Sequence, residues 1–536
     1  MTKHNLSISG PGWIKSSTED RICVFCHTPH LARVDSPYLW NRQDTTGHIP
    51  YQSTTLYASI GQPTGASKMC LSCHDGTIAL GALLFPPEIP FTGGIRFIPE
   101  GPSKLGTDLS DDHPVSFVYN STLANNNGEL IQPSALPPQI RLDNNAEMQC
   151  NSCHDPHFDI HGKFLVMSDS YSALCTACHD KNGWGISTHS TSNAVWNGLG
   201  ADPWPVSSYD TVSENGCKNC HVSHNAGGHE RLLNYQFEED TCLACHNGNV
   251  AATDIELQLS KQYRHPVQNY TGIHDPAEDF TSGSVTEHVE CTDCHNPHWS
   301  NDNTSSGAPL ISGVSEGVTG INAAGQNVST VSNQYEICFK CHADNNVIDV
   351  MSIDRQIQQL NTRLEFDSSN PSYHPVESQG INVNVPSLLP PYTESSIIFC
   401  TDCHSSDSSE PSGPHGSIYE HLLSDNYVTL DFTSESPLTY ELCYKCHDRN
   451  SLLADQSGFS HNNHVVNEST PCAACHDAHG IDFIQGNSQN NSHLINFDIT
   501  IVQADSQGRL RFEDNGTFSG QCFLRCHNAA HEPLSY

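Results

Sequence analysis

Residues 150–157 read CNSCHDPH, and this short stretch decides how the chain is organised. It holds two cysteines three positions apart, a histidine directly after the second cysteine, and another histidine three positions later. On a helical turn, residues i, i+3 and i+4 share one face, so both thiols and the first imidazole point the same way. Such thiols can reach the vinyl groups of one porphyrin while the imidazole reaches its iron, and Cys-x-x-Cys-His is the attachment signature of c-type haem.

This motif accounts for every cysteine of the chain. The 24 cysteines form twelve pairs, each followed by a histidine, and only the twelfth pair has an extra residue between its cysteines. A disulfide framework or a zinc ribbon also uses Cys-x-x-Cys, but neither requires that histidine. We expect a bulged turn to accommodate the wider twelfth motif. The predicted thioether cysteines and proximal iron ligands are Cys23, Cys26 and His27; Cys70, Cys73 and His74; Cys150, Cys153 and His154; Cys175, Cys178 and His179; Cys217, Cys220 and His221; Cys242, Cys245 and His246; Cys291, Cys294 and His295; Cys338, Cys341 and His342; Cys400, Cys403 and His404; Cys443, Cys446 and His447; Cys472, Cys475 and His476; and Cys522, Cys526 and His527.

Composition favours the same interpretation. Only 36% of the 536 residues are hydrophobic and 8% are aromatic, too few for several conventional cores, because apolar burial has to offset the ordering of every residue. Twelve covalent haems would supply the missing apolar bulk. We therefore predict a mostly irregular, loop-rich fold with short α-helices at the haem-attachment motifs, forming an elongated multihaem cytochrome wrapped around a chain of twelve c-type haems.

The remaining histidines are numerous enough to close every iron. Of 33 histidines twelve are proximal, which leaves 21 for twelve sixth positions (33 − 12 = 21), so all irons can be bis-histidine and low-spin. Histidines at recurrent positions are the best candidates, although a single one can equally be a surface turn residue. The predicted distal ligands are His30, His157, His224, His298, His415 and His479 downstream of motifs; His113, His265 and His374 in His-Pro-Val; the looser His189 and His464; and His4.

Nine other histidines have no recurrent position, and we predict that they are solvated or lie next to ligands. His288, three residues before Cys291, is the strongest rival to His265 among them. The nine are His48, His161, His229, His274, His288, His421, His461, His493 and His531.

The motifs recur as doublets: an upstream histidine, then CxxCHxxH, then a plain CxxCH. Six doublets follow one another, and we predict one domain-like segment for each: 1–110 for the N-terminal haem doublet, 111–185, 186–255, 256–350, 351–455, and 456–536 with the CxxxCH motif.

These doublets resemble the doubled-CxxCH multihaem c-type cytochromes over most of the chain, from His113 to His527. The N-terminal stretches HNLSISGPG, RICVFCHTPH, LWNR and GQPTGASKMCLSCHDGTIALG resemble the start of the extracellular cytochrome nanowires of metal-respiring bacteria. That resemblance implies end-to-end polymerisation, stacked bis-histidine haems, and a histidine of one subunit completing a haem of the next. His4 is then the first candidate for such an inter-subunit ligand, although it can equally complete a haem of its own doublet.

An iron with two protein ligands cannot bind a substrate, so twelve closed haems predict electron hopping rather than catalysis. The predicted function is a filament subunit that passes electrons to external acceptors. A non-polymerising carrier or charge store in the periplasm or outside the cell is the alternative. A multihaem reductase is a weaker alternative, because it needs one open iron, for which the irregular motif at Cys522 and Cys526 is the first suspect.

Location and partners follow from chemistry and charge. Covalent haem attachment takes place outside the cytoplasm, so we predict an exported protein, extracellular or at the cell surface first and periplasmic second. The first 30 residues contain no apolar signal region, and TIALGALLF is too short to span a bilayer. A net charge of −37 argues against nucleic acid and favours basic redox partner cytochromes or mineral acceptors. The acidic runs DLSDDH and EFDSSN are weak candidates for Ca²⁺, without EF-hand spacing.

Overall fold

The structure is a computed structural model that describes residues 2–34, 37–45, 47–268, 270, 272, 288–344, 352–408 and 411–536. It divides into two compact units, residues 1–245 and 246–536. His274, expected to be solvated, lies outside the described residues. None of the described helices is long and apolar enough to cross a lipid bilayer.

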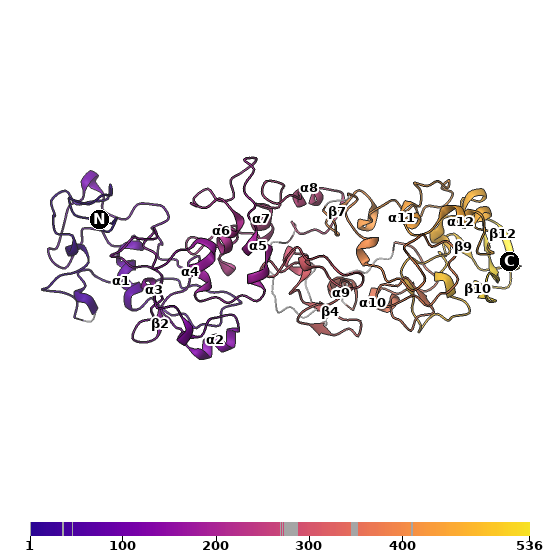
Figure 1. Ribbon diagram of the computed structural model, residues 1–536, viewed down its shortest axis with the longest axis horizontal. Coiled ribbons are helices and arrows are strands. Elements are labelled where there is room, and N and C mark those ends of the chain that lie inside the picture. The colour runs from indigo at the N-terminus through magenta and orange to yellow at the C-terminus, as the bar shows by residue number, and fades with distance from the viewer. Residues whose placement is uncertain are drawn as a thin grey trace. The chain divides into compact units, whose positions relative to one another are not determined.

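The first unit consists mainly of loops that connect short helices at or near the cysteine motifs (Figure 1). Helix α1 carries the second motif and packs beside α3, which carries the third. One two-residue ladder pairs β1 with β2, antiparallel, with Phe117 opposite Met148. The elements are α1 (Gly65–His74), α2 (Ser121–Asn127), α3 (Cys150–Cys153), α4 (Ala173–Thr176), α5 (Thr188–Thr191), α6 (Val212–Asn215), α7 (Glu238–Leu243), β1 (Phe117–Val118) and β2 (Glu147–Met148).

The second unit is built in the same way up to about its last forty residues. Its short antiparallel ladders pair β3 with β7, β4 with β5, and β6 with β8. The helices are α8 (Ile255–Leu259), α9 (Tyr335–His342), α10 (Thr362–Glu365), α11 (Glu441–Tyr444) and α12 (Arg449–Leu453). The strands of these ladders are β3 (Tyr263–Arg264), β4 (Gly320–Ile321), β5 (Asn327–Val328), β6 (Ser372–Tyr373), β7 (Gly416–Ser417) and β8 (Gly480–Ile481).

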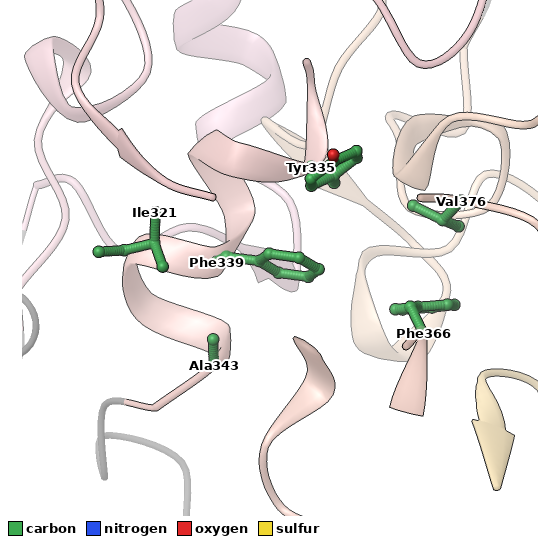
Figure 2. Packing of buried hydrophobic residues seen from close by; sticks show 6 residues of the cluster. All are labelled: Ile321, Tyr335, Phe339, Ala343, Phe366 and Val376. Carbon is green, nitrogen blue, oxygen red and sulfur yellow. The ribbon is translucent and has the colours of Figure 1, made fainter. Parts of the chain in front are cut away.

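Buried apolar side chains form small clusters beside the motifs. The cluster on α9 contains six buried residues, and Figure 2 shows Phe339 pointing from the helix toward Phe366. Cys341 and Cys400, from the eighth and ninth motifs, pack against this cluster. The apolar interior therefore continues up to the cysteines themselves, where a covalently bound group would extend it. The six residues are Ile321, Tyr335, Phe339, Ala343, Phe366 and Val376.

A four-stranded antiparallel sheet near the C-terminus departs from this plan. It contains β9 (Val502–Gln503), β10 (Arg511–Asp514), β11 (Gly520–Cys526) and β12 (Ala529–Ser535). Both cysteines of the twelfth motif lie on β11. The prediction of a short helix at every attachment motif is therefore wrong at this motif. Cysteines four positions apart share a face of a strand as they do of a helix, so the wider spacing suits a strand as well.

Elsewhere the secondary structure agrees with the sequence. The other eleven motifs begin within short α- or 3₁₀-helices, and irregular backbone connects them. The ranges of the six doublets remain predictions.

Candidate haem sites

Each regular motif is a single tight turn that places its histidine. The backbone N–H of His154 donates to the carbonyl of Cys150 at 3.0 Å, and His404 bonds Cys400 in the same way at 2.9 Å. The residue before the second cysteine often caps the turn. Ser152 Oγ accepts a hydrogen bond from the backbone N–H of Gln149, as Asp293 and Asp402 carboxylates do at their own motifs. A short polar side chain at this position therefore helps to close the turn, because it satisfies a backbone donor that the helix leaves unpaired.

A second repeated contact fixes the tautomer of the proximal histidine. His154 Nδ1 lies 2.8 Å from the carbonyl of Lys163, and His404 Nδ1 lies 2.8 Å from the carbonyl of His421. A carbonyl only accepts, so the proton is on Nδ1 and Nε2 keeps its lone pair for a metal. Equivalent bonds hold His27, His221 and His476, on the carbonyls of Tyr38, Arg231 and His493.

The accepting carbonyls belong to a turn that the sequence marks only weakly. Lys163 and Phe164 have φ of 50° and 60°, and His421 and Leu422 have φ of 59° and 55°. Two successive left-handed residues reverse the chain and bring it back to the histidine, so that His154 pairs with Leu165 and His404 with Leu423. The Leu-Leu or Leu-Ile segments after many first motifs are therefore the return of this turn toward the histidine.

Imidazole pairs mark where metal ions fit. An imidazole nitrogen binds a metal at about 2.0–2.1 Å and lies about 1 Å from the centre of its own ring, so two rings on opposite sides of one iron have centres about 6.2 Å apart. Imidazole pairs whose ring centres lie 6.1–6.4 Å apart include nine among the described residues. They are His4 with His74, His27 with His157, His113 with His179, His154 with His224, His265 with His342, His295 with His415, His404 with His479, His461 with His476, and His464 with His531.

The pairs follow a rule that motif spacing did not provide. The upstream histidine of a doublet meets the second proximal histidine of the same doublet: His4 meets His74, and His113 meets His179. Within each unit, the downstream histidine meets the first proximal histidine of the preceding doublet. Thus His157 lies opposite His27, and in the second unit His479 lies opposite His404 in the same way.

Most of the paired histidines are partly buried, and His531 is buried. Burial lowers the pKa of His476 to about 4, and that of His179 to about 3. The neutral imidazole is the form that binds iron, so burial and ligation favour the same protonation state. Burial likewise lowers the pKa of His447 to about 4, with His374 as the next contribution, which places these two rings near each other.

One predicted ligand, His30, lies apart from the paired rings among the described residues. His30 is exposed and contacts no other imidazole within the described residues, whereas His157 occupies the position opposite His27. His30 therefore stays a predicted ligand for which the described residues provide no partner ring. His4 lies beside His74 of the same chain, which favours the intramolecular of its two predicted roles. His189 and His298 remain predicted ligands.

Two paired histidines, His461 and His531, were not among the predicted ligands. His461 lies three residues before His464, and both precede the eleventh motif, so one was expected to be superfluous. The structure pairs each with a different ring. The signal in the sequence was the doubled histidine HNNH in place of the single upstream histidine of other doublets.

Consecutive motifs touch through their cysteines. The neighbouring Cys150 thiol and burial raise the pKa of the Cys70 thiol, and the Cys217 thiol and burial raise that of Cys175, so these thiols lie close together. Hydroxyl groups reinforce both contacts: the backbone N–H of Cys150 donates to Ser67 Oγ at 3.0 Å, and that of Cys217 donates to Ser172 Oγ at 2.8 Å.

Neighbouring thiols lie near one another at every further step within each unit. Inside each doublet, the second cysteine of the first motif lies near a thiol of the second motif. Burial raises the pKa of that cysteine, and the neighbouring thiol raises it further. These neighbours are Cys26 and Cys73, Cys153 and Cys178, Cys220 and Cys245, Cys294 and Cys338, Cys403 and Cys443, and Cys475 and Cys522. Between doublets of the second unit, Cys338 contacts Cys400 and Cys472 lies near Cys443. The order of motifs in space therefore follows the sequence within each unit.

Two of the predicted distal histidines bond buried carboxylates. His224 Nδ1 lies 2.9 Å from Asp112 Oδ1, and His479 Nδ1 lies 2.8 Å from Glu365 Oε2. Both carboxylates are buried. Other distal rings bond backbone carbonyls instead, as His265 does with Pro414 at 2.7 Å. A carboxylate partner makes an imidazole a stronger electron donor to its metal.

These two acids come from the runs considered for Ca²⁺. Asp112 belongs to DLSDDH and Glu365 to EFDSSN, and each is engaged with a histidine. Among the described residues no group of three or more His, Cys, Asp or Glu side chains is arranged to hold a metal ion. The Ca²⁺ prediction therefore gains no support.

Comparisons with known proteins place the chain among multihaem cytochromes. A family model described as outer membrane cytochrome MtrC/MtrF-like, domains II/IV, matches residues 209–371. A model of the doubled CXXCH motif matches residues 144–183 and 390–452. Multiheme cytochrome MtrA of Shewanella baltica (strain OS185) is 20% identical over 210 residues, which cover 37% of this chain and 43% of that protein. The chain thus spans less than half the length of this curated relative, and what these comparisons show is its similarity to multihaem cytochromes with doubled CXXCH motifs.

Proposed function

We propose that the chain is an electron conductor holding twelve haems with two histidine ligands each. Bound haem would supply a one-electron ferrous–ferric couple, so that single electrons pass from site to site. The protein's part is to hold the cysteine pairs in consecutive contact and to close both faces of each site with imidazole. The observation that carries the proposal is the set of nine imidazole pairs at 6.1–6.4 Å.

The consecutive contacts support a single path within each unit. Cys26, Cys73, Cys70 and Cys150 link the first three motifs, and Cys294, Cys338 and Cys400 link the seventh to the ninth. Sites joined in this way need no diffusing carrier between them. The pairing leaves no room for a substrate on those irons, which favours conduction over the reductase alternative.

A filament subunit outside the cell is the proposed form, supported by the nanowire-like N-terminal stretches. Exposed His30 suits that proposal: it follows a first motif, as the proposed ligands His157 and His479 do, yet it meets no imidazole among the residues that the structure describes. It therefore replaces His4 as the candidate for donation to another chain. One observation favours the alternative of a separate carrier. His476 is already paired with His461, so the last doublet does not require a ligand from outside.

Two experiments test the proposal. Mass spectrometry should find twelve haems on the purified chain, and the ferric spectrum should be entirely low-spin without stoichiometric cyanide binding. High-spin iron that binds cyanide or nitrite would instead support a reductase site. Negative-stain imaging of the unmodified protein and of His30→Ala tests assembly: filaments lost in the variant support donation, and dispersed particles from both proteins support the carrier.

A further inference from the structure

The twelfth motif presents its cysteines on a strand. Cys522, Leu524 and Cys526 alternate along β11 and so share one face. That face packs into a cluster with buried Phe497, Val502 and Phe512, and with Cys475 of the eleventh motif. Both thiols therefore face the neighbouring attachment site, as thiols of consecutive motifs do elsewhere in the chain.

The histidine that follows the second cysteine of this motif, His527, has different contacts from those of the regular motifs. His527 and Asn528 have φ of 47° and 66° and form the two-residue turn between β11 and β12, the arrangement expected of a type I′ hairpin. His527 Nε2 lies 3.0 Å from both carboxylate oxygens of Asp431, and its ring stacks on Phe432 with centres 4.5 Å apart. In the regular motifs described above, Nδ1 of the histidine is hydrogen-bonded to a carbonyl and Nε2 is left for iron. In His527, Nε2 is the nitrogen that is hydrogen-bonded.

A second histidine shares the face of the cysteines. His531 on β12 is directly opposite Leu524 on β11, and residues directly opposite one another in an antiparallel ladder lie on the same face. His531 is buried, with 8% of its surface exposed. Its ring centre is 6.1 Å from that of His464, whose Nδ1 lies 2.8 Å from the carbonyl of Ser460 and leaves Nε2 available.

The His464–His531 pair matches the other eight in separation but differs in membership. Each of the other eight contains the histidine of a CxxCH motif, and this one contains none. His464 is also the upstream histidine of the last doublet. By the pairing rule above, an upstream histidine lies opposite the ring that belongs to the second motif of its doublet, which here is the twelfth motif. The ring opposite His464 is that of His531.

We infer that the haem on Cys522 and Cys526 takes His531 and His464 as its iron ligands, and that His527 anchors the hairpin turn on Asp431. The inference rests on the proposed haem at this motif. The attachment signature is then Cys-x₃-Cys-x₄-His, in which the hairpin register supplies the ligand in place of a helical turn.

The experiment begins by counting haems. Mass spectrometry of the unmodified chain should show twelve; eleven, with free thiols at Cys522 and Cys526, would refute the twelve-haem proposal itself. With twelve present, an image reconstruction should place the imidazole of His531 on the iron at Cys522 and Cys526. Density joining that iron to His527 would overturn the inference while leaving the proposed function intact.

Matched variants provide a second readout. His531→Ala carrying twelve haems should gain one high-spin ferric iron per chain and bind one equivalent of cyanide. His527→Gln keeps a donor for Asp431 and should stay entirely low-spin. The opposite result, an open iron in His527→Gln and none in His531→Ala, would contradict the assignment. If either variant lacks the twelfth haem, the image reconstruction of the unmodified protein decides between His531 and His527 as the iron ligand.

Discussion

Eleven cysteine pairs begin on helical turns, and the twelfth lies on one strand of a β-hairpin. On a turn the histidine after the second cysteine is held on the face of the thiols, as at His154, whose backbone bonds Cys150. On the hairpin the residue after Cys526 enters the reversal, and the ring beside the cysteines comes from the opposite strand. The comparison teaches that backbone conformation, and not adjacency in sequence, decides which histidine accompanies a cysteine pair.

The two regions also differ in how much protein surrounds the cysteines. Cys341 packs against a cluster of six buried residues, which come from the short helix α9, the two-residue strand β4 and loop segments. Cys522 and Cys526 pack against Phe497, Val502, Phe512 and Leu524, and their strand is hydrogen-bonded to β9, β10 and β12. We expect the helical sites to depend more on the haem for stability than the hairpin does.

The largest expected effect comes from removing a haem on each side of this comparison. Cys338→Ala with Cys341→Ala should lower the melting temperature by about 10 °C or more, because several kcal/mol of apolar burial are lost with the porphyrin. Cys522→Ala with Cys526→Ala should lower it by less than half as much, because the sheet persists. Calorimetry on proteins with eleven haems by mass makes the measurement, and equal losses would break the comparison.

A ligand substitution tests the pairing rule on the helical side. His4→Ala should open one iron, because His4 is the ring opposite His74, and the dissolved chain should gain one high-spin ferric iron by electron paramagnetic resonance. His30→Ala is the matched control and should leave dispersed protein fully low-spin. A low-spin spectrum for His4→Ala would show that another group closes that site.

A smaller effect is expected where a carboxylate bonds a distal ring. Asp112→Asn and Glu365→Gln should each raise the reduction potential of one haem by about 20–60 mV, since a hydrogen bond is worth about 0.5–1.5 kcal/mol and tenfold in equilibrium is about 59 mV for one electron. Spectroelectrochemistry measures the shift. Asp111→Asn, beside Asp112, is the control and should shift the titration less; equal shifts would indicate a general charge effect.

The smallest expected effect is on the free energy of unfolding when a glycine is placed in the hairpin or in a helical turn. Asn528 has φ of 66°, in the left-handed region that glycine adopts freely, so Asn528→Gly should stabilise the hairpin by up to about 1 kcal/mol. Asn151→Gly, in the helical turn of the third motif, should destabilise by about 0.5–1 kcal/mol. Denaturant unfolding should therefore show opposite signs, and the same sign for both would argue against one of the two conformations.

Much of the site was determined by the sequence alone. The cysteine positions and the doublet repeat follow from spacing, since chemistry requires two thiols and an imidazole on one face wherever the backbone is helical. The loop-rich fold with short helices follows from the scarcity of apolar residues. These features are local, so a window of eight residues contains the information.

The tertiary structure decided which rings face each other. His157 meets His27 across 130 positions of sequence (157 − 27), and His479 meets His404; neither pairing can be obtained from spacing, because the intervening loops set it. The same limit applies to His531, whose place beside Cys522 and Cys526 depends on hairpin register. Local spacing determines how a haem is attached, whereas closing its iron takes a ring from a distant segment, and only the folded chain brings that segment to it.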